Sequence, residues 1–333
     1  MKTRQQQSGW KMTFLCVLLI LSMAFAIVPK SIQSQEGKFP SKPVEVIVNV
    51  TPGGHADIVA RIVGEYISKE LKTQIVVKNI PGGGGLTGAV AFLNARSDGH
   101  TMFIGPIVSG VLLSKNPPFD LRKDLLPVGG VYETAMAMAV GKNSPYESFD
   151  DFVKVAKNNP GKLKGATTVL GTEVHYMFLA IKKDTNTDIK LVPYPGVGQM
   201  LAALMGGHLD FTTQTLPSAM PYVKSGDLRI LLLSSASPQL PGVPVGSDKG
   251  LPNVSPSING ASGFFVHPQT PQFAYEKLVS AVEAAVKNPE CRKKLIDLGD
   301  VVEYRNPKEF SKKINEQWDV FSRFIKESDV KLD

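Results

Sequence analysis

The sequence predicts an α/β protein built from two α/β units. The chain has 333 residues, 43% of them hydrophobic, which is enough for one large domain or two ordinary ones. Strand-like and helix-like segments alternate along it, and the second half repeats the theme of the first. In each half a glycine-containing turn joins a strand-like segment to a helix-like one. This alternation predicts mostly parallel sheets covered by helices.

Residues 1–26 predict a secretory signal peptide. The segment 12–28 is apolar, and small residues follow at Ala24-Phe25-Ala26. We place cleavage after Ala26, with sites up to residue 35 open. An uncleaved anchor is the alternative, because the apolar run approaches the length of a membrane span. The basic residues that precede the run are Lys2, Arg4 and Lys11.

The composition excludes several classes of partner and cofactor. Removing the three basic residues of the signal peptide lowers the net charge from +7 to about +4. The remaining basic residues are spread along the chain, which predicts no nucleic-acid partner. One cysteine, Cys291, then remains, and the five histidines lie in no metal-ligand pattern. We therefore expect no disulfide, no metal and no cofactor.

The first half predicts the order strand, helix, strand, helix, strand. The first strand is buried and runs over 44–50, and the next helix, 57–71, carries its apolar residues on one face. The remaining elements are a strand over 74–78, a helix over 86–95 and a strand over 101–104.

The second half predicts a similar alternation, followed by helices. Residues 238–256 are rich in proline and glycine and predict an irregular connection. Strands are expected over 163–168, 190–192, 210–215, 228–234 and 263–266, and helices over 150–158, 173–183, 197–205, 271–287, 289–298 and from Pro307 onward.

Two turns are candidate anion sites. Pro52-Gly53-Gly54-His55-Ala56-Asp57 joins a strand to a helix, where glycines and unpaired helix N–H groups suit an anion. Asp57 either caps the helix or contributes to the site, and His55 either binds a carboxylate or is solvated. The second turn, Leu170-Gly171-Thr172, also precedes a helix. There His175 could simply brace the turn, and Glu173 would repel an anion.

Catalytic motifs are scarce. Residues 83–88 match G-x-G-x-x-G, but Asn79-Ile80-Pro81-Gly82 separates them from the preceding strand, and the next strand ends without an acid. No phosphate loop, nucleophile turn or carboxylate pair is present in the sequence. We therefore expect no catalytic residues, and the sequence favours binding over chemistry.

Several segments have a specific order and spacing along nearly all of the mature chain. They include TPGGHADIVAR, KNIPGGGGLTGA, SDGHTMFIG, NPGKLKGATT, GTEVHYMF and VPYPGVGQMLAALMGGHLDF. With these segments the chain resembles the periplasmic solute receptors of tripartite tricarboxylate transporters, also called the Bug family.

The resemblance implies a type II periplasmic binding fold, with two α/β lobes, a ligand cleft between them and two crossing hinge segments. Lobe one would comprise residues 37–135 and 258–333, and lobe two residues 136–257. The hinges would lie near residues 131–141 and 257–266.

The resemblance also carries over site residues. The first binding loop falls on Gly53, Gly54, His55 and Asp57, the second on Gly171, Thr172 and His175, with Gly196 and Gln214 nearby. Family members often hold the ligand through backbone N–H groups and bridging waters. This chain departs from the family at Val169-Leu170, Glu173, Pro195 and Gln214-Thr215. We expect Leu170, Phe103 and Ile107 to offer an apolar wall.

The implied function is an extracytoplasmic receptor, periplasmic and monomeric by default, which passes a solute to membrane permease subunits. The expected solute is a small organic acid with at least one carboxylate and an apolar or aromatic part. A ligand-sensing lobe for a membrane signalling partner is one alternative, and an extracytoplasmic α/β enzyme is another.

Overall fold

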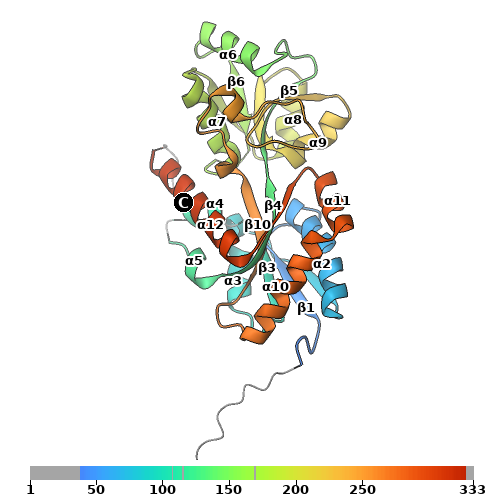
Figure 1. Cartoon of the computed structure of the whole chain (residues 1–333). Coiled ribbons are helices and arrows are strands. Elements are labelled where there is room, and N and C mark those ends of the chain that lie inside the picture. Colours follow the sequence, from blue (N-terminus) through green and yellow to red (C-terminus); the bar gives the residue numbers. More distant parts are fainter. Residues whose placement is uncertain (1–37, 107, 115, 169, 328–333) are drawn as a thin grey trace, which may run out of the picture. The chain divides into compact units, whose positions relative to one another are not determined.

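A computed structural model describes residues 38–106, 108–114, 116–168 and 170–327 (Figure 1). The predicted signal peptide and its cleavage site lie outside these residues. The account below concerns the compact unit that begins at Lys42. Within the described residues, every helix is too short or too polar to cross a membrane.

Among the described residues, six strands form the first sheet, in the order β11-β4-β10-β3-β1-β2. β1 runs parallel to β2 and β3, whereas β10 runs antiparallel to β3 and β4, and β11 antiparallel to β4. The bounds are β1 Val44–Val48, β2 Ile75–Asn79, β3 Thr101–Ile104, β4 Leu126–Thr134, β10 Gly260–Val266 and β11 Val301–Arg305.

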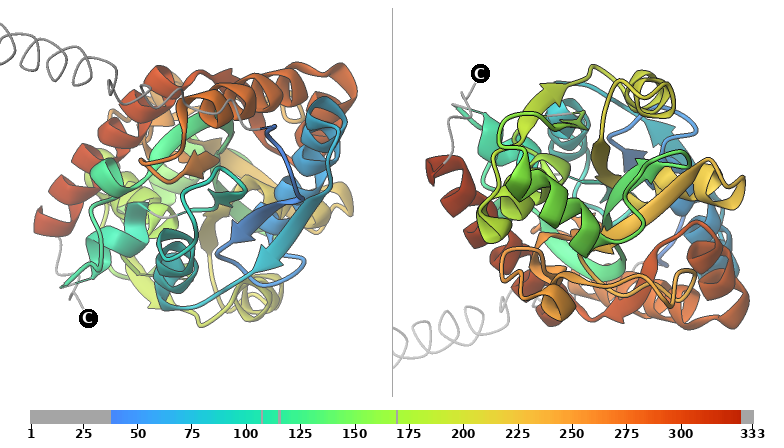
Figure 2. Two further views of the ribbon diagram at one scale, coloured as in Figure 1. Left: turned by 90° about the horizontal axis from the view of Figure 1, so that it is seen from below. Right: turned by 90° about the horizontal axis from the view of Figure 1, so that it is seen from above.

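Helices cover both faces of this sheet, and together they form the first lobe. α2 packs against α10 on one face, where Figure 2 shows α2 in blue beside the orange α10. α3, α4 and α12 share an apolar cluster with Ile47 and Phe103 on the other face. The helices are α2 His55–Leu71, α3 Leu86–Leu93, α4 Val108–Leu113, α5 Leu121–Asp124, α10 Gln272–Lys287, α11 Pro289–Asp297 and α12 Pro307–Glu327, with a 3₁₀ turn η1 at Gly83–Gly85.

Five strands form the second sheet within the same described ranges, in the order β7-β6-β8-β5-β9. β6 is parallel to β7 and β8, and β5 is antiparallel to β8 and β9. This sheet and its helices form the second lobe. Its elements are β5 Met136–Gly141, α6 Phe149–Asn158, β6 Lys164–Thr167, α7 Glu173–Thr185, β7 Lys190–Pro193, α8 Val197–Met205, β8 Phe211–Thr215, α9 Leu216–Lys224, β9 Leu228–Leu233, η2 Gly246–Lys249 and η3 Pro256–Ile258.

At β5, an interior strand, the second sheet is apolar on both faces, and large and small apolar residues alternate along the strand. Met136, Met138 and Val140 of β5 join the cluster that contains Phe211 and residues of α7. Ala135, Ala137 and Ala139 point the other way, into a cluster with residues of α8 and α9. The strand is therefore buried on both sides, with side-chain volume rather than polarity distinguishing its faces.

The chain crosses between the sheets twice. The first crossing is at Ala135, since β4 ends at Thr134 in the first sheet and β5 begins at Met136 in the second. The second lies between β9 and β10. These crossing strands make both sheets mixed, so the expectation of mostly parallel sheets is wrong beyond the β2-β1-β3 and β7-β6-β8 groups.

Buried polar side chains tie the two crossings together. Asn259 Nδ2 donates to Glu133 Oε2 over 3.2 Å and to Ser235 Oγ over 2.9 Å. Ser234 Oγ donates to Asn259 Oδ1 over 2.6 Å and accepts from Met136 N over 2.8 Å. Residues flanking both crossings thus share one hydrogen-bond network.

Candidate functional site

The loop between β1 and α2 leads into a helix whose first N–H groups are not capped by a side chain of the described residues. Gly53 has φ +79°, a conformation that favours glycine. Gly54 is the N-cap residue, and within the described chain no side chain caps the helix. Since the first N–H groups of a helix have no intrahelical acceptors, this end presents donors and a partial positive charge. A carboxylate suits such an end.

Asp57 shapes this loop. Its Oδ2 accepts from Gly53 N over 2.9 Å and from Arg61 Nε over 3.1 Å, and its Oδ1 accepts from Asn79 Nδ2 over 2.9 Å. Burial alone would raise the pKa of Asp57, but the hydrogen bonds from Arg61, Gly53 and Asn79 outweigh it, and the pKa lies below its usual range. The carboxylate therefore stays charged, and it holds the loop in place by accepting the N–H of Gly53.

His55, the first residue of α2, contacts a distant part of the chain. Its Nε2 lies 2.8 Å from Oδ1 of Asp300, whose side chain is fully buried. Its ring also meets the edge of Tyr132, with centroids 5.2 Å apart. His55 is thus held against the first lobe, with its ring still partly exposed.

The second loop has the same backbone construction as the first, but an imidazole replaces the carboxylate as the acceptor. Gly171 has φ +84°, and its N–H donates to Nδ1 of His175 over 2.9 Å. His175 is 5% exposed, and burial lowers the pKa of its imidazole to about 4. The ring is therefore neutral at physiological pH and braces the turn. Helix α7 begins at Glu173, and its N-cap residue Thr172 makes no side-chain cap hydrogen bond within the described residues.

The second lobe adds polar groups around this loop. Gly196 is the N-cap residue of α8, again with no side-chain cap within the described chain. Gln214 is buried on β8, and its Oε1 finds no hydrogen-bond partner among the described residues. Burial raises the pKa of Glu173, which weakens the repulsion of an anion expected from the sequence.

The structure groups the predicted residues by lobe. Gly53, Gly54, His55 and Asp57 share one loop. Gly171, Thr172 and His175 share another. The second loop also touches the first lobe, because a Cβ built on Gly171 would lie 2.3 Å from Leu113 of α4. Gly196 and Gln214 lie on other elements of the second lobe.

Two residues near the first loop were missed from the sequence. Asp300 is one, and Asn49, which follows β1, is the other. Asn49 is 4% exposed, its Nδ2 donates to Pro106 O over 2.7 Å, and a Cβ built on Gly105 would lie 1.8 Å from its Oδ1. Asn49 thus holds the loops after β1 and β3 together. No local pattern marks either residue in the sequence.

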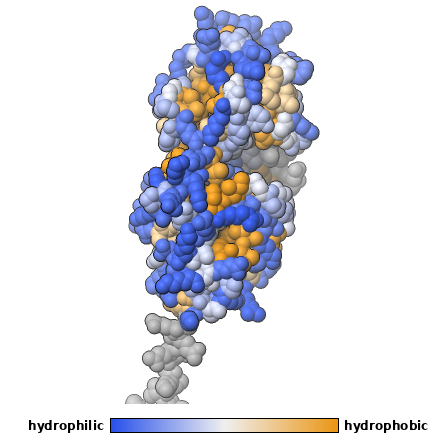
Figure 3. Space-filling model, turned by 90° about the vertical axis from the view of Figure 1, so that its right-hand side faces the viewer, coloured by the Kyte–Doolittle hydropathy of each residue, from blue (hydrophilic) through white to orange (hydrophobic). Residues whose placement is uncertain are grey.

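The expected apolar wall is only partly available. Phe103 is fully buried in the core of the first lobe, so its assignment to the wall is wrong. Ile107 lies outside the described residues. Leu170 is 43% exposed, one of three large exposed hydrophobic residues in the described ranges with Val76 and Met205. Figure 3 shows one face of the molecule, where apolar areas interrupt a mostly hydrophilic surface.

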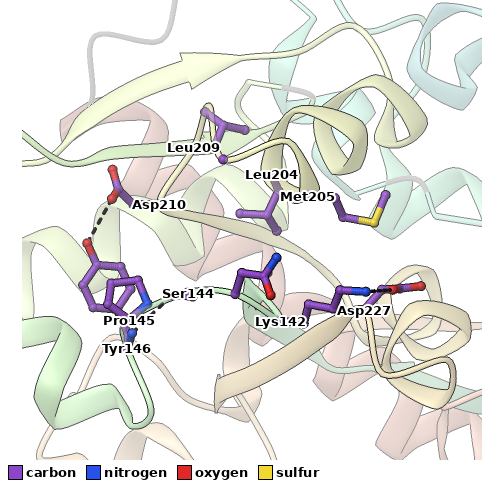
Figure 4. Close-up of a pocket in the computed structure, with 12 residues that line it drawn as sticks. Lys142, Ser144, Pro145, Tyr146, Leu204, Met205, Leu209, Asp210 and Asp227 are labelled. Carbon is purple, nitrogen blue, oxygen red and sulfur yellow. Dashed lines mark hydrogen bonds and ion pairs between the residues drawn. The ribbon is translucent and has the colours of Figure 1, made fainter.

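A cavity of about 340 Å³ lies away from both loops (Figure 4). Lys142, Tyr146, Asp210 and Asp227 line it, together with Leu204 and Met205 at the end of α8. Asp210 directly precedes β8, so this cavity is at the amino end of that strand. The loops at Gly171 and Gly196 follow the carboxyl ends of β6 and β7. The cavity contains none of the predicted site residues.

Comparisons with known proteins identify the family and the fold. A sequence model described as the tripartite tricarboxylate transporter family receptor, TctC, matches residues 59–330. BugT of Bordetella pertussis (strain Tohama I) is 29% identical over 220 residues, which cover 64% of this chain and 68% of BugT.

Two solved structures are similar over most of the chain. One, described as a periplasmic transporter, is 33% identical, has a TM-score of 0.74 and covers 89% of this chain and 100% of its own. MatC from Rhodopseudomonas palustris, solved with bound malate, is 26% identical, has a TM-score of 0.71 and covers 86% of this chain and 100% of its own. Both support a type II periplasmic binding fold. The chain belongs to the tripartite tricarboxylate transporter receptor family, which includes the Bug proteins and whose members are periplasmic solute receptors and not enzymes.

Proposed function

We propose that this protein binds a small carboxylate-bearing organic acid outside the cytoplasm and delivers it to a tripartite membrane permease. The observation that carries the proposal is the construction shared by the two loops. Each places a glycine with positive φ before a helix that starts without a side-chain cap in the described chain. Two open helix starts suit a ligand with negative charge.

We assign ligand contacts to the loop backbones and to the exposed polar atoms beside them. Gly54, His55, Thr172 and Gly196 lie at the starts of α2, α7 and α8. We also assign Gln214, whose Oε1 is buried without a partner in the described chain and, as an acceptor, suits a hydroxyl group or a bridging water rather than a carboxylate oxygen. Asp57 and His175 do not contact the ligand in this proposal. Each supports its loop instead, because each already accepts the N–H of the loop glycine.

The energetics suit a receptor without catalytic groups. Micromolar affinity corresponds to about 8 kcal/mol. Each charge-assisted hydrogen bond contributes roughly 1.5–3 kcal/mol, so a few N–H groups on one carboxylate supply most of it. Leu170, which is 43% exposed beside the second loop, favours a ligand that also has an apolar part. The malate in the related MatC supports a carboxylate but leaves the remainder of the ligand open.

The test is a thermal-shift screen followed by calorimetry on the mature chain, freed of carried-over ligand by unfolding and refolding. The panel contains malate, aliphatic dicarboxylates of increasing length, citrate, aromatic acids and the matching amides. A ligand that binds only the folded state raises the melting temperature. We expect a rise with one class of acid and none with its amide. Equal shifts with acid and amide, or none with any acid, would contradict the proposal.

Delivery to a permease and periplasmic location need separate tests. We propose that residues 1–26 direct export, so a fusion that lacks them should stay in the cytoplasmic fraction. Uptake of the acid identified above should require both this chain and the membrane subunits. Uptake that persists without this chain would contradict the transport assignment and favour a sensor.

A further inference from the structure

Asp300 is joined to the first binding loop across most of the sequence. Its Oδ1 lies 2.8 Å from Nε2 of His55, 245 positions away. The Asp300 side chain is fully buried, whereas the His55 side chain is 28% exposed. A buried group from the far end of the chain thus contacts a side chain at the start of α2.

Two residues of strand β4 contact Asp300 and His55 and hold them in place. Thr134 Oγ1, at the end of β4, lies 3.4 Å from the same Oδ1 of Asp300. Tyr132, on the same strand, meets the His55 ring edge-on, with an interplanar angle of 85°. Ring contact on one side and a hydrogen bond on the other fix the orientation of the imidazole.

This orientation leaves the other ring nitrogen available. Nε2 is occupied by Asp300, and Nδ1 makes no hydrogen bond within the described residues. Nδ1 is also absent from the buried unpartnered polar atoms of that part of the chain, so it reaches solvent. It belongs to the first residue of a helix whose start has no side-chain cap in the described residues. A ligand at this helix start would meet it.

Asp300 is an unfavourable residue for stability alone. Its Oδ2 is buried and has no hydrogen-bond partner among the described residues. A buried carboxylate with one unsatisfied oxygen costs free energy. Burial accordingly raises the pKa of Asp300, although His55 and Thr134 act in the opposite direction. Such a cost beside a binding loop points to a functional role.

We propose that Asp300 is a positioning residue: it accepts the Nε2–H of His55 and so presents the lone pair of Nδ1, at the start of α2, to a hydroxyl group of the ligand or to a water that bridges to its carboxylate. The inference rests on the proposed function for its purpose, and on the contacts of Asp300 with His55 and Thr134 for its geometry. It also links the first loop to β4, the strand that leads into the crossing at Ala135.

The first experiment needs no ligand. The mature chain is labelled with ¹⁵N-histidine, and the imidazole nitrogens are observed by NMR at several pH values. We expect the His55 signals, assigned with His55→Gln, to show a single form with the proton on Nε2. Asp300→Ala should return them to the average of free histidine, while Asp300→Asn, which keeps an acceptor oxygen, should preserve them. His55 signals unchanged in Asp300→Ala would overturn the inference.

The second experiment measures affinity by calorimetry with malate and with the acid that shifts the melting temperature most. Asp300→Ala and His55→Ala should each weaken binding by up to about tenfold, as expected for losing one hydrogen bond to the ligand or its bridging water. The double variant should be no weaker than either single variant, because Asp300 acts through His55. Asp300→Asn should stay within about threefold of wild type.

The outcomes separate this inference from the proposed function. Additive losses in the double variant, or unchanged affinity in Asp300→Ala, would overturn the positioning role while leaving a carboxylate receptor. Wild type that binds no acid would instead contradict the proposed function, and the NMR experiment would still decide whether Asp300 fixes the ring. If Asp300→Ala does not fold, Asp300→Val, which fills more of the space, replaces it in both experiments.

Discussion

The backbone N–H of Gly171 donates to Nδ1 of His175 over 2.9 Å, and the same relation recurs in the other lobe between Gly53 and Oδ2 of Asp57, also over 2.9 Å. In both cases the acceptor lies four residues after a glycine with positive φ and on the first turn of the following helix. The two lobes thus hold equivalent loops with different acceptors. The carboxylate of Asp57 carries charge, whereas the imidazole of His175 must stay neutral to accept.

The neutral state of His175 predicts a loss of stability in mild acid. Its pKa is lowered to about 4 by burial, while the ordinary value is 6.5. Between pH 6.5 and about 4, His175 is therefore protonated in the unfolded chain but stays neutral in the folded chain. The contribution is fully present above pH 6.5 and is lost as the pH falls toward 4. It amounts to about 3 kcal/mol over that window.

Urea unfolding of wild type and His175→Gln at several pH values between 4 and 7 checks this. The variant should show a smaller loss of stability over the window, and the difference between the two proteins should shrink as the pH falls. His208→Gln is the control, since His208 is exposed at the end of α8. Parallel curves for wild type and His175→Gln would contradict the assignment.

Asp57 predicts a different pH profile. Its pKa lies below the ordinary value of 3.8 because its hydrogen bonds outweigh its burial. Its contribution is therefore present above about pH 4 and is lost only as the pH falls through the lower folded value. Asp57→Asn should cost about 1–3 kcal/mol at neutral pH, because the amide turns a donor toward Arg61 or Asn79. Glu65→Gln, exposed on the same helix, should stay within about 0.5 kcal/mol in the same urea experiment.

The regular parts of the fold were predictable because their residues follow simple periods. β3 and α8 have the bounds expected from the sequence, and α2, β1 and α7 differ by a few residues at their ends. Apolar runs and one-sided apolar faces identify such elements without any knowledge of their neighbours.

Of the crossing strands, β4 and β5 were not predicted and β10 was predicted only over 263–266, for physical reasons. β4 contains Gly129-Gly130, which favours a loop reading, yet a Cβ on Gly130 would lie 3.0 Å from Phe310 of α12. On β10, a Cβ on Gly263 would lie 2.2 Å from Gly129 O. These glycines allow close packing between distant segments, and only tertiary structure reveals that need. α9 was missed because Pro217 and Pro221 suggest a turn.

Some site residues could likewise be predicted from local sequence and others could not. Asp57 and His175 lie four residues after their glycines, so a local pattern could identify them. Asp300 meets His55 only because β11 pairs with β4 and brings residue 300 beside Thr134. A contact over such a separation leaves no local signal in a single sequence.

The network at the crossings predicts a large loss of stability when its acid is removed. Glu133 is 4% exposed and lies 2.5 Å from Arg305 Nη1 and 3.2 Å from Lys313 Nζ. Lys313 is itself 8% exposed, so Glu133→Gln leaves a buried cation without its acid. We expect a cost of about 3–5 kcal/mol in urea unfolding. Glu133→Gln combined with Lys313→Met should recover part of the lost free energy of unfolding. A double variant as unstable as Glu133→Gln alone would show that the two residues are not coupled.

Two glycines at the start of α8, one at the N-cap and one inside the helix, test the second-lobe site without disturbing the fold. A Cβ built on Gly196 or on Gly198 meets no atom within 4 Å. Gly196, the N-cap residue, has φ −162°, which any residue adopts. Gly196→Ala should therefore cost no more than about 1 kcal/mol, since alanine is less favourable than glycine at an N-cap, while Gly198→Ala inside the helix should gain up to about 1 kcal/mol. If the start of α8 contacts the ligand, the added methyl group at Gly196 should weaken binding about tenfold in calorimetry, roughly 1.4 kcal/mol. Gly198→Ala should bind as wild type does, and equal affinities for the two variants would place the ligand away from α8.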